Sequence, residues 1–105
     1  LDAHLIHGQV VDSEGEPIND VTVEVYQTYQ LVEYRFDDET AEDGVFTIFL
    51  PPEMSGIWTV EITNVACSSR IMDERCVYPG EFANFGRDYI RLPHSAPVVF
   101  EYRSP

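Results

Sequence analysis

Apolar residues in this chain recur at every second position, and residues that favour turns interrupt the pattern roughly every ten residues. Segment 21–27 alternates valine with threonine, glutamate and tyrosine, and segment 57–63 places Trp58, Val60 and Ile62 at one parity. A period of two sends successive side chains to opposite faces of a β-strand, whereas a helix needs a period of about 3.6. No stretch shows a convincing helical period, so the sequence predicts an all-β fold.

The same pattern divides the chain into about seven strands. These are expected at residues 4–12, 21–27, 30–36, 45–50, 57–63, 88–92 and 96–102. Four residues at apolar parities are expected to anchor the core: Val23, Phe46, Trp58 and Val60. Between the first two strands, Gly15 tolerates a positive φ and Pro17 presets its own φ, which predicts a hairpin connection.

The length and charge limit what the chain can be. Its 105 residues suit one domain, 1–105, which at this size buries about 60–70% of the surface of the unfolded chain. The formal charge is −13, from 19 acidic residues against six arginines and no lysine, and it opposes binding to nucleic acid or to an anionic membrane surface. No apolar run approaches the roughly 18 residues of a membrane helix, so no membrane span is expected.

The two cysteines, Cys67 and Cys76, are separated by eight residues. This spacing suits a clip across a loop better than a zinc or redox site, so we expect a disulfide within a long polar loop, 67–87. A disulfide indicates an oxidising compartment, and therefore an extracellular or cell-surface location. The alternative is a pair of reduced thiols.

Three stretches, 8–25, 40–46 and 58–62, together resemble the carboxypeptidase regulatory-like domains, which belong to the transthyretin-like superfamily and are related to bacterial surface-protein repeats. The resemblance implies an antiparallel, Ig-like or transthyretin-like β-sandwich of about seven strands. It covers residues 6–63 well and 88–102 loosely, and the disulfide-clipped loop looks like an insertion. It implies little about activity, because such modules occur as stalks, repeats and appendages of unrelated extracellular proteins.

One turn within this likeness has a physical explanation. In the sequence from Thr40 to Phe46, Asp43 is placed to accept backbone N–H groups, and Gly44 can adopt a conformation that is costly for other residues. We expect the turn to return Phe46 to the core in register. The motif is therefore interpreted as structural.

Residues able to carry catalysis are present but not in a catalytic pattern. The chain has no Gly-x-Ser-x-Gly motif, so a nucleophilic serine is not indicated. His4 and His7 are three residues apart, which puts them on opposite faces of a strand, and His94 follows a proline in a turn, so a histidine zinc site is not indicated. We expect no enzyme activity and no cofactor.

Five acidic residues lie within seven positions of a predicted turn at 37–44: Asp37, Asp38, Glu39, Glu42 and Asp43. Carboxylate oxygens at this density are ligands that calcium accepts, but the spacing is not that of an EF-hand. We predict a solvated acidic turn without bound metal, with these five residues as the calcium candidates.

Several apolar residues lie at strand positions whose side chains would face solvent in an isolated sandwich. These residues predict an interface. Segment 1–5 precedes the first family-like strand, and the last strand is apolar at both parities, so a strand exchanged between neighbouring subunits would cover both. The predicted interface residues are Leu1, Leu5, Tyr26, Phe49, Val98, Val99, Phe100 and Tyr102. In the alternative, both segments pair within their own domain.

The first functional hypothesis is a non-catalytic extracellular module, either a subunit of a surface fibre or a stalk repeat, that assembles head-to-tail by β-strand addition. The alternative is an accessory carbohydrate-binding domain of a larger secreted enzyme, in which Tyr26 and Phe49, with Tyr29 or Tyr34, stack on sugar rings. The expected partner is thus another copy of the chain or, in the alternative, carbohydrate.

Overall fold

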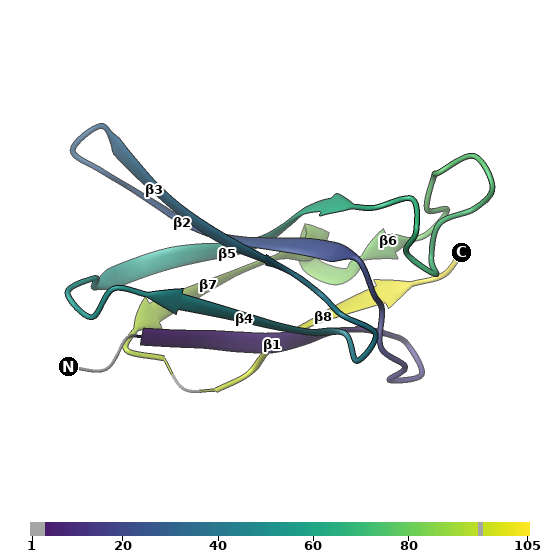
Figure 1. Cartoon of the computed structure of the whole chain (residues 1–105), viewed down its shortest axis with the longest axis horizontal. Helices are drawn as coiled ribbons and strands as arrows, with labels where there is room; N and C mark the ends of the chain where they lie inside the picture. The colour runs from purple at the N-terminus through teal and green to yellow at the C-terminus, as the bar shows by residue number, and fades with distance from the viewer. Residues whose placement is uncertain (1–3, 95) are drawn as a thin grey trace.

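The computed structural model describes residues 4–94 and 96–105, and this part of the chain folds into two four-stranded sheets packed face to face (Figure 1). Sheet A has the order β4-β1-β8-β6 and sheet B the order β3-β2-β5-β7, which confirms the all-β sandwich. The elements are β1 (His4–Asp12), β2 (Val21–Tyr29), β3 (Val32–Glu39), β4 (Val45–Leu50), β5 (Gly56–Val65), β6 (Glu81–Phe82), the 3-10 helix η1 (Ala83–Gly86), β7 (Arg87–Leu92) and β8 (Val98–Arg103).

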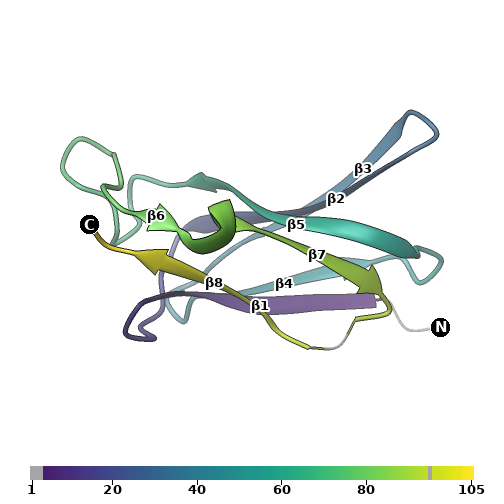
Figure 2. The ribbon, with the colours of Figure 1, turned by 180° about the vertical axis from the view of Figure 1, so that it is seen from behind.

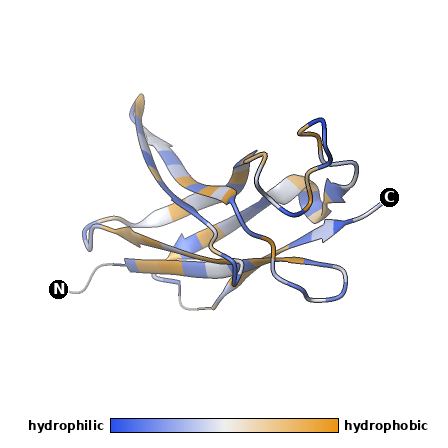
Figure 3. Ribbon diagram, turned by 45° about the vertical axis from the view of Figure 1, so that its right-hand side comes forward, coloured by the Kyte–Doolittle hydropathy of each residue, from blue (hydrophilic) through white to orange (hydrophobic). Residues whose placement is uncertain are grey.

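The core lies between the sheets and is built by the alternation seen in the sequence, which appears as alternating colours along the strands in Figure 3. The four residues expected to anchor it are fully buried: Val23, Phe46, Trp58 and Val60. In the turn that follows β3, the Asp43 carboxylate accepts the N–H of Val45 at 3.0 Å and Gly44 has a φ of 71°. The predicted structural role of this turn is confirmed.

One strand pairing differs from a purely antiparallel sandwich. β1 and β8 run parallel, with Gly8 beside Val98 and Val10 beside Phe100, while the remaining pairings are antiparallel. The connection after β7 crosses from sheet B to sheet A, so β8 enters sheet A from the end at which β1 begins (Figure 1). Pairing partners depend on such crossovers, and no local pattern reports them.

The connection between β1 and β2 is not the hairpin that Gly15 and Pro17 predict. The chain does turn tightly, since Asp12 N–H donates to the Glu16 carbonyl at 2.9 Å. It then leaves sheet A and enters sheet B, and β1 pairs with β4 and β8 instead. The sequence correctly predicted a tight turn after β1. It did not predict that the next strand, β2, belongs to the other sheet.

The hairpin of β2 and β3 extends beyond the sandwich (Figure 1). Its turn is Gln30 and Leu31, with φ values of 47° and 66°, where glycine, asparagine or aspartate is usual. The third strand therefore starts at residue 32 instead of residue 30, and it continues to Glu39, into the predicted acidic turn.

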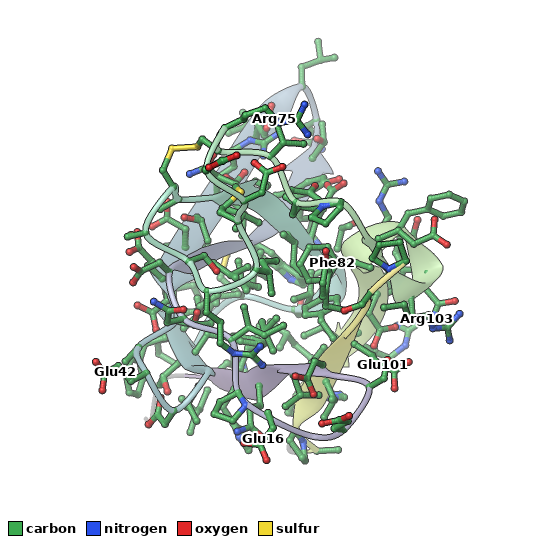
Figure 4. All side chains as sticks on the ribbon, turned by 90° about the vertical axis from the view of Figure 1, so that its right-hand side faces the viewer. Glu16, Glu42, Arg75, Phe82, Glu101 and Arg103 are labelled. Atoms are coloured by element: carbon green, nitrogen blue, oxygen red, sulfur yellow. A yellow bond between two sulfur atoms is a disulfide. The ribbon has the colours of Figure 1, made fainter. Side chains whose placement is uncertain are left out.

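Segment 67–87 contains the predicted disulfide, Cys67–Cys76, seen on the loop that carries Arg75 in Figure 4. It is not a single irregular loop, because it also forms β6 and η1. Arg70 holds it against the turn after β1, donating to the Pro17 carbonyl at 2.7 Å and to the Asp12 carboxylate at 2.8 Å. The disulfide-clipped segment is thus docked on the sandwich.

Candidate protein interaction surface

The outer face of sheet A carries several exposed apolar side chains. Phe49 is 64% exposed, Val99 59%, and Leu5 and Val45 each 40%. Leu5 and Phe49 are cross-strand neighbours, and Gln9 lies between Val45 and Val99. We call this surface the low-charge face and define it by Leu5, His7, Gln9, Val45, Thr47, Phe49 and Val99.

None of these seven residues is an aspartate, glutamate or arginine, although the chain carries a formal charge of −13. Charged residues begin at the C-terminal end of β8, where Arg103 donates to Glu101 at 3.0 Å (labelled in Figure 4). Protein interfaces have a core depleted of charge and a polar rim. The low-charge face has that arrangement.

The outer face of sheet B, unlike the low-charge face, is rich in charged side chains. Glu61 accepts a hydrogen bond from the Tyr26 hydroxyl at 2.9 Å and from Arg87 at 2.7 Å. Arg35 lies 4.5 Å above the Tyr26 ring and pairs with Glu24. The Arg87 guanidinium lowers the pKa of the Glu61 carboxyl below its ordinary value of 4.5, and the hydrogen bond from Tyr26 acts in the same direction.

This cluster predicts a specific loss of stability in acid. Because the pKa of Glu61 is lower in the folded chain, the unfolded chain binds more protons as the pH falls through 4.5. The stabilisation is therefore present above pH 4.5 and is lost as the pH falls through the folded-state pKa. Glu61→Gln should destabilise the protein near neutral pH, and its deficit relative to wild type should shrink by about pH 3.

Urea unfolding at about pH 7 and about pH 3 measures this deficit. Glu42→Gln is the matched control, since Glu42 is exposed and has no ion pair within residues 4–94 and 96–105. Each of the two variants loses one negative charge, so any general effect of the lower net charge on stability is the same in both. The difference between Glu61→Gln and Glu42→Gln therefore reports the contacts of Glu61. A Glu61→Gln deficit that is equal at both pH values would contradict the assignment.

The structure brings only some of the predicted interface residues together. Leu5, Phe49 and Val99 share the low-charge face. The prediction for the other residues of β8 is wrong, because three of them fill the chain's own core and are each 3% exposed: Val98, Phe100 and Tyr102. The last strand is apolar on both faces, so the sequence pattern could not say which face is covered internally.

The described part of the predicted inter-subunit strand, residues 4 and 5, pairs within its own chain. Leu1 lies outside the described residues. His4 and Leu5 already belong to β1, where they pair with Leu50 and Phe49. The alternative, in which this segment pairs within its own domain, therefore holds for residues 4 and 5, because both pair with β4; the other edge of β1 is paired with β8 only from Gly8 onward.

The predicted aromatic platform does not form. Tyr26 lies on the outer face of sheet B, beneath Arg35, whereas Phe49 lies on the outer face of sheet A. Tyr34 is partly buried and packs against the core, and the Tyr29 side chain lies outside the described part of the structure. The sequence showed the exposed parity of Tyr26 and Phe49 but not that they belong to different sheets.

The calcium candidates are not gathered in one loop. Asp37, Asp38 and Glu39 belong to β3, where neighbouring side chains point to opposite faces. The Asp38 carboxylate accepts the N–H of Thr47 at 2.8 Å and so links β3 to β4. Glu42 and Asp43 lie in the following turn. Within residues 4–94 and 96–105, no group of three His, Cys, Asp or Glu residues is placed to hold a metal ion.

β8 has an open edge, which sequence reasoning missed. β6 pairs with β8 only at Tyr102 and Arg103. The Arg103 carbonyl faces the β6 side, against Gly80, so the backbone groups of Val99 and Glu101, at the same parity, face that side too. There they meet a groove of about 310 Å³ lined by Ala83, Asn84, Arg87, Asp88, Val99, Phe100 and Glu101.

The chain leaves the line of β6 because η1 is a left-handed turn, which stands between β6 and β7 in Figure 2. Asn84 has a φ of 54°, Phe85 of 58° and Gly86 of 64°. This conformation costs about 1–2 kcal/mol for each residue other than glycine. It also leaves the Phe85 side chain 92% exposed. Phe85 is a single aromatic residue in a polar segment, and no sequence periodicity signals it.

No protein-family model and no curated protein matches this chain. Across the described residues, no helix is both long enough and apolar enough to span a membrane.

Proposed function

We propose that this chain is a non-catalytic extracellular module that joins protein chains by pairing its low-charge face with the same face of a second copy. The observation that carries the proposal is the lack of acidic residues and arginine among the seven residues of the low-charge face, four of them exposed and apolar, in a chain of charge −13. The disulfide Cys67–Cys76 supports an oxidising compartment. The candidate histidines do not support a metal site, since His4 and His7 lie on opposite faces of β1.

Electrostatics favours this surface over the others for self-association. Two copies of a strongly acidic protein repel one another, and the repulsion is largest where acidic groups of the two copies come close together. Sheet B presents Glu24, Asp37 and Glu61 on its outer face, whereas the low-charge face presents Phe49 and Leu5. Pairing through the low-charge face buries apolar surface and keeps the carboxylates apart.

The size of this face sets the expected strength. A standard interface uses about 20–30 residues on each side. The low-charge face has seven defining residues, so pairs of isolated modules should be weak. Modules that repeat along a stalk or fibre would act together, because tethering raises the effective concentration of the second contact to about the millimolar range.

A face-to-face pair closes as a two-fold dimer, and a fibre needs a second contact. The open edge of β8 supports such a contact by strand addition, since the backbone groups of Val99 and Glu101 face a groove and not a strand. This edge lies beside the low-charge face through Val99. The two contacts together would give a growing assembly.

The test is a charge placed on the most exposed apolar side chain of the low-charge face, Phe49. Phe49→Asp should weaken self-association at least about tenfold, because it removes a large apolar group and introduces mutual repulsion. Sedimentation equilibrium over a wide concentration range measures the dissociation constant. The matched control is Ile57→Asp, which places the same charge on a residue of similar exposure, 54%, in sheet B.

The proposal requires that wild type and Ile57→Asp associate alike while Phe49→Asp does not. A wild-type protein that stays monomeric up to about millimolar concentration would refute it. Equal weakening by both substitutions would also refute it, since general repulsion and not the low-charge face would then be responsible.

A further inference from the structure

An open pocket of about 650 Å³ lies next to η1 and outside the low-charge face. It is lined by Asn84, Phe85, Arg87, Asp88 and Tyr89, and we call it the η1 pocket. Pockets that bind small molecules have volumes of about 300–1,000 Å³. The η1 pocket lies within this range.

Two exposed aromatic rings line the η1 pocket. Phe85 is 92% exposed and Tyr89 is 61% exposed. Phe85 reaches this position from a positive φ of 58°, which is uncommon for a bulky residue. Strained backbone that persists in a folded protein is concentrated at binding and catalytic sites. Here the strained residue is the one that presents an uncovered ring.

The polar groups of the pocket are partly fixed by hydrogen bonds and partly free. One oxygen of Asp88 accepts the N–H of Tyr89 at 2.8 Å, and the other has no hydrogen bond within the described residues. Arg87 is fixed by Glu61 at 2.7 Å. The Asn84 backbone carbonyl accepts the N–H of Arg87, while its side-chain amide has no partner in the described part of the chain. The pocket thus offers an oriented acceptor, a fixed cation and a free amide.

We propose that the η1 pocket binds a neutral saccharide. A sugar ring has an apolar C–H face that can pack on Phe85 or Tyr89, and hydroxyl groups that both donate to and accept from Asp88 and Asn84. An apolar peptide side chain would leave these polar groups dehydrated and unpaired, at a cost in affinity. Arg87 is already paired with Glu61, so it offers no free positive charge to an anion, and the acidic chain as a whole repels anions; both disfavour a charged acidic sugar and leave a neutral one.

Affinity electrophoresis of the purified chain tests this. The native gels contain a soluble neutral polysaccharide: hydroxyethyl cellulose, laminarin, starch, galactomannan or arabinogalactan. Gels with alginate as an anionic polysaccharide run beside them. We expect retardation of the wild-type protein in at least one neutral gel, and none with alginate. Phe85→Ala and Tyr89→Ala should each weaken that binding about tenfold, as truncation of a central aromatic contact does.

Two further variants separate binding from folding. Phe85→Tyr keeps the ring and should retain retardation. Phe49→Ala removes from the low-charge face an aromatic residue about as exposed as Tyr89, 64% against 61%, and should have no effect, so this result is independent of the proposed self-association. The proposal is overturned by the absence of retardation in every neutral gel, by preferential retardation in alginate, or by binding that survives Phe85→Ala combined with Tyr89→Ala. Equal loss in Phe49→Ala would also overturn it.

Discussion

Gly8→Ala is expected to lower the free energy of unfolding by about 3 kcal/mol or more. A methyl group at this position would overlap the Val98 carbonyl oxygen and come within 2.6 Å of the Phe46 ring. β1 lies between β4 and β8, so it cannot shift away from one without pressing on the other. Because total stability is about 5–15 kcal/mol, the variant should melt far below wild type or fail to fold.

Gly15→Ala is the control for the backbone effect of the same substitution. Gly15 has a φ of 83°, and nothing lies within 4 Å of the added methyl group. Its expected cost is that of the left-handed conformation alone, about 1–2 kcal/mol. Guanidinium unfolding followed by far-UV circular dichroism measures both variants. Equal losses would show that the close packing of β1 on β8 is not what excludes a side chain from Gly8.

Trp58→Ala should cost about 3–5 kcal/mol, the range for truncating a buried large aromatic residue. The ring is fully buried on β5 and lies 6.2 Å from that of Phe36, between centroids. Its indole N–H donates to the Ser55 carbonyl at 3.0 Å. The cavity would open between the two sheets, in the core.

Trp58→Phe separates packing from the hydrogen bond. Phenylalanine retains much of the apolar volume but leaves the Ser55 carbonyl without this donor, so we expect a loss of about 1–2 kcal/mol. Trp58 is the only tryptophan, so circular dichroism and not intrinsic tryptophan fluorescence should follow unfolding. A Trp58→Phe variant as unstable as Trp58→Ala would contradict a dominant role for packing volume.

The alternation of apolar and polar residues was sufficient to predict the all-β class and much of the core. Val23, Phe46, Trp58 and Val60 are buried because a strand sends alternate side chains to the same face, and this property is local. The turn at Asp43 and Gly44 was predictable for the same reason. Cys67 and Cys76 are close in sequence, so their pairing also needed little tertiary information.

Exposed surfaces were predicted less well, because the alternation along a strand shows which side chains point outward but not which sheet the strand joins. Leu5, Phe49 and Val99 meet on one face only because β4, β1 and β8 are neighbours in sheet A. Tyr26 has the same exposed parity but belongs to sheet B. The interface prediction was therefore correct about exposure for some residues, and strand order decided which of them form a surface.

The sequence by itself determined the local features of this protein: the period of two, the turn chemistry, the disulfide spacing and the strong negative charge. Tertiary structure alone decided the parallel pairing of β1 with β8 and the strand order that assembles the low-charge face. The physical reason is the range of the interactions. Alternation and turns depend on residues a few positions apart, whereas Phe49 and Val99 come to share one face only because β4, β1 and β8, formed by segments far apart in the chain, are neighbours in sheet A.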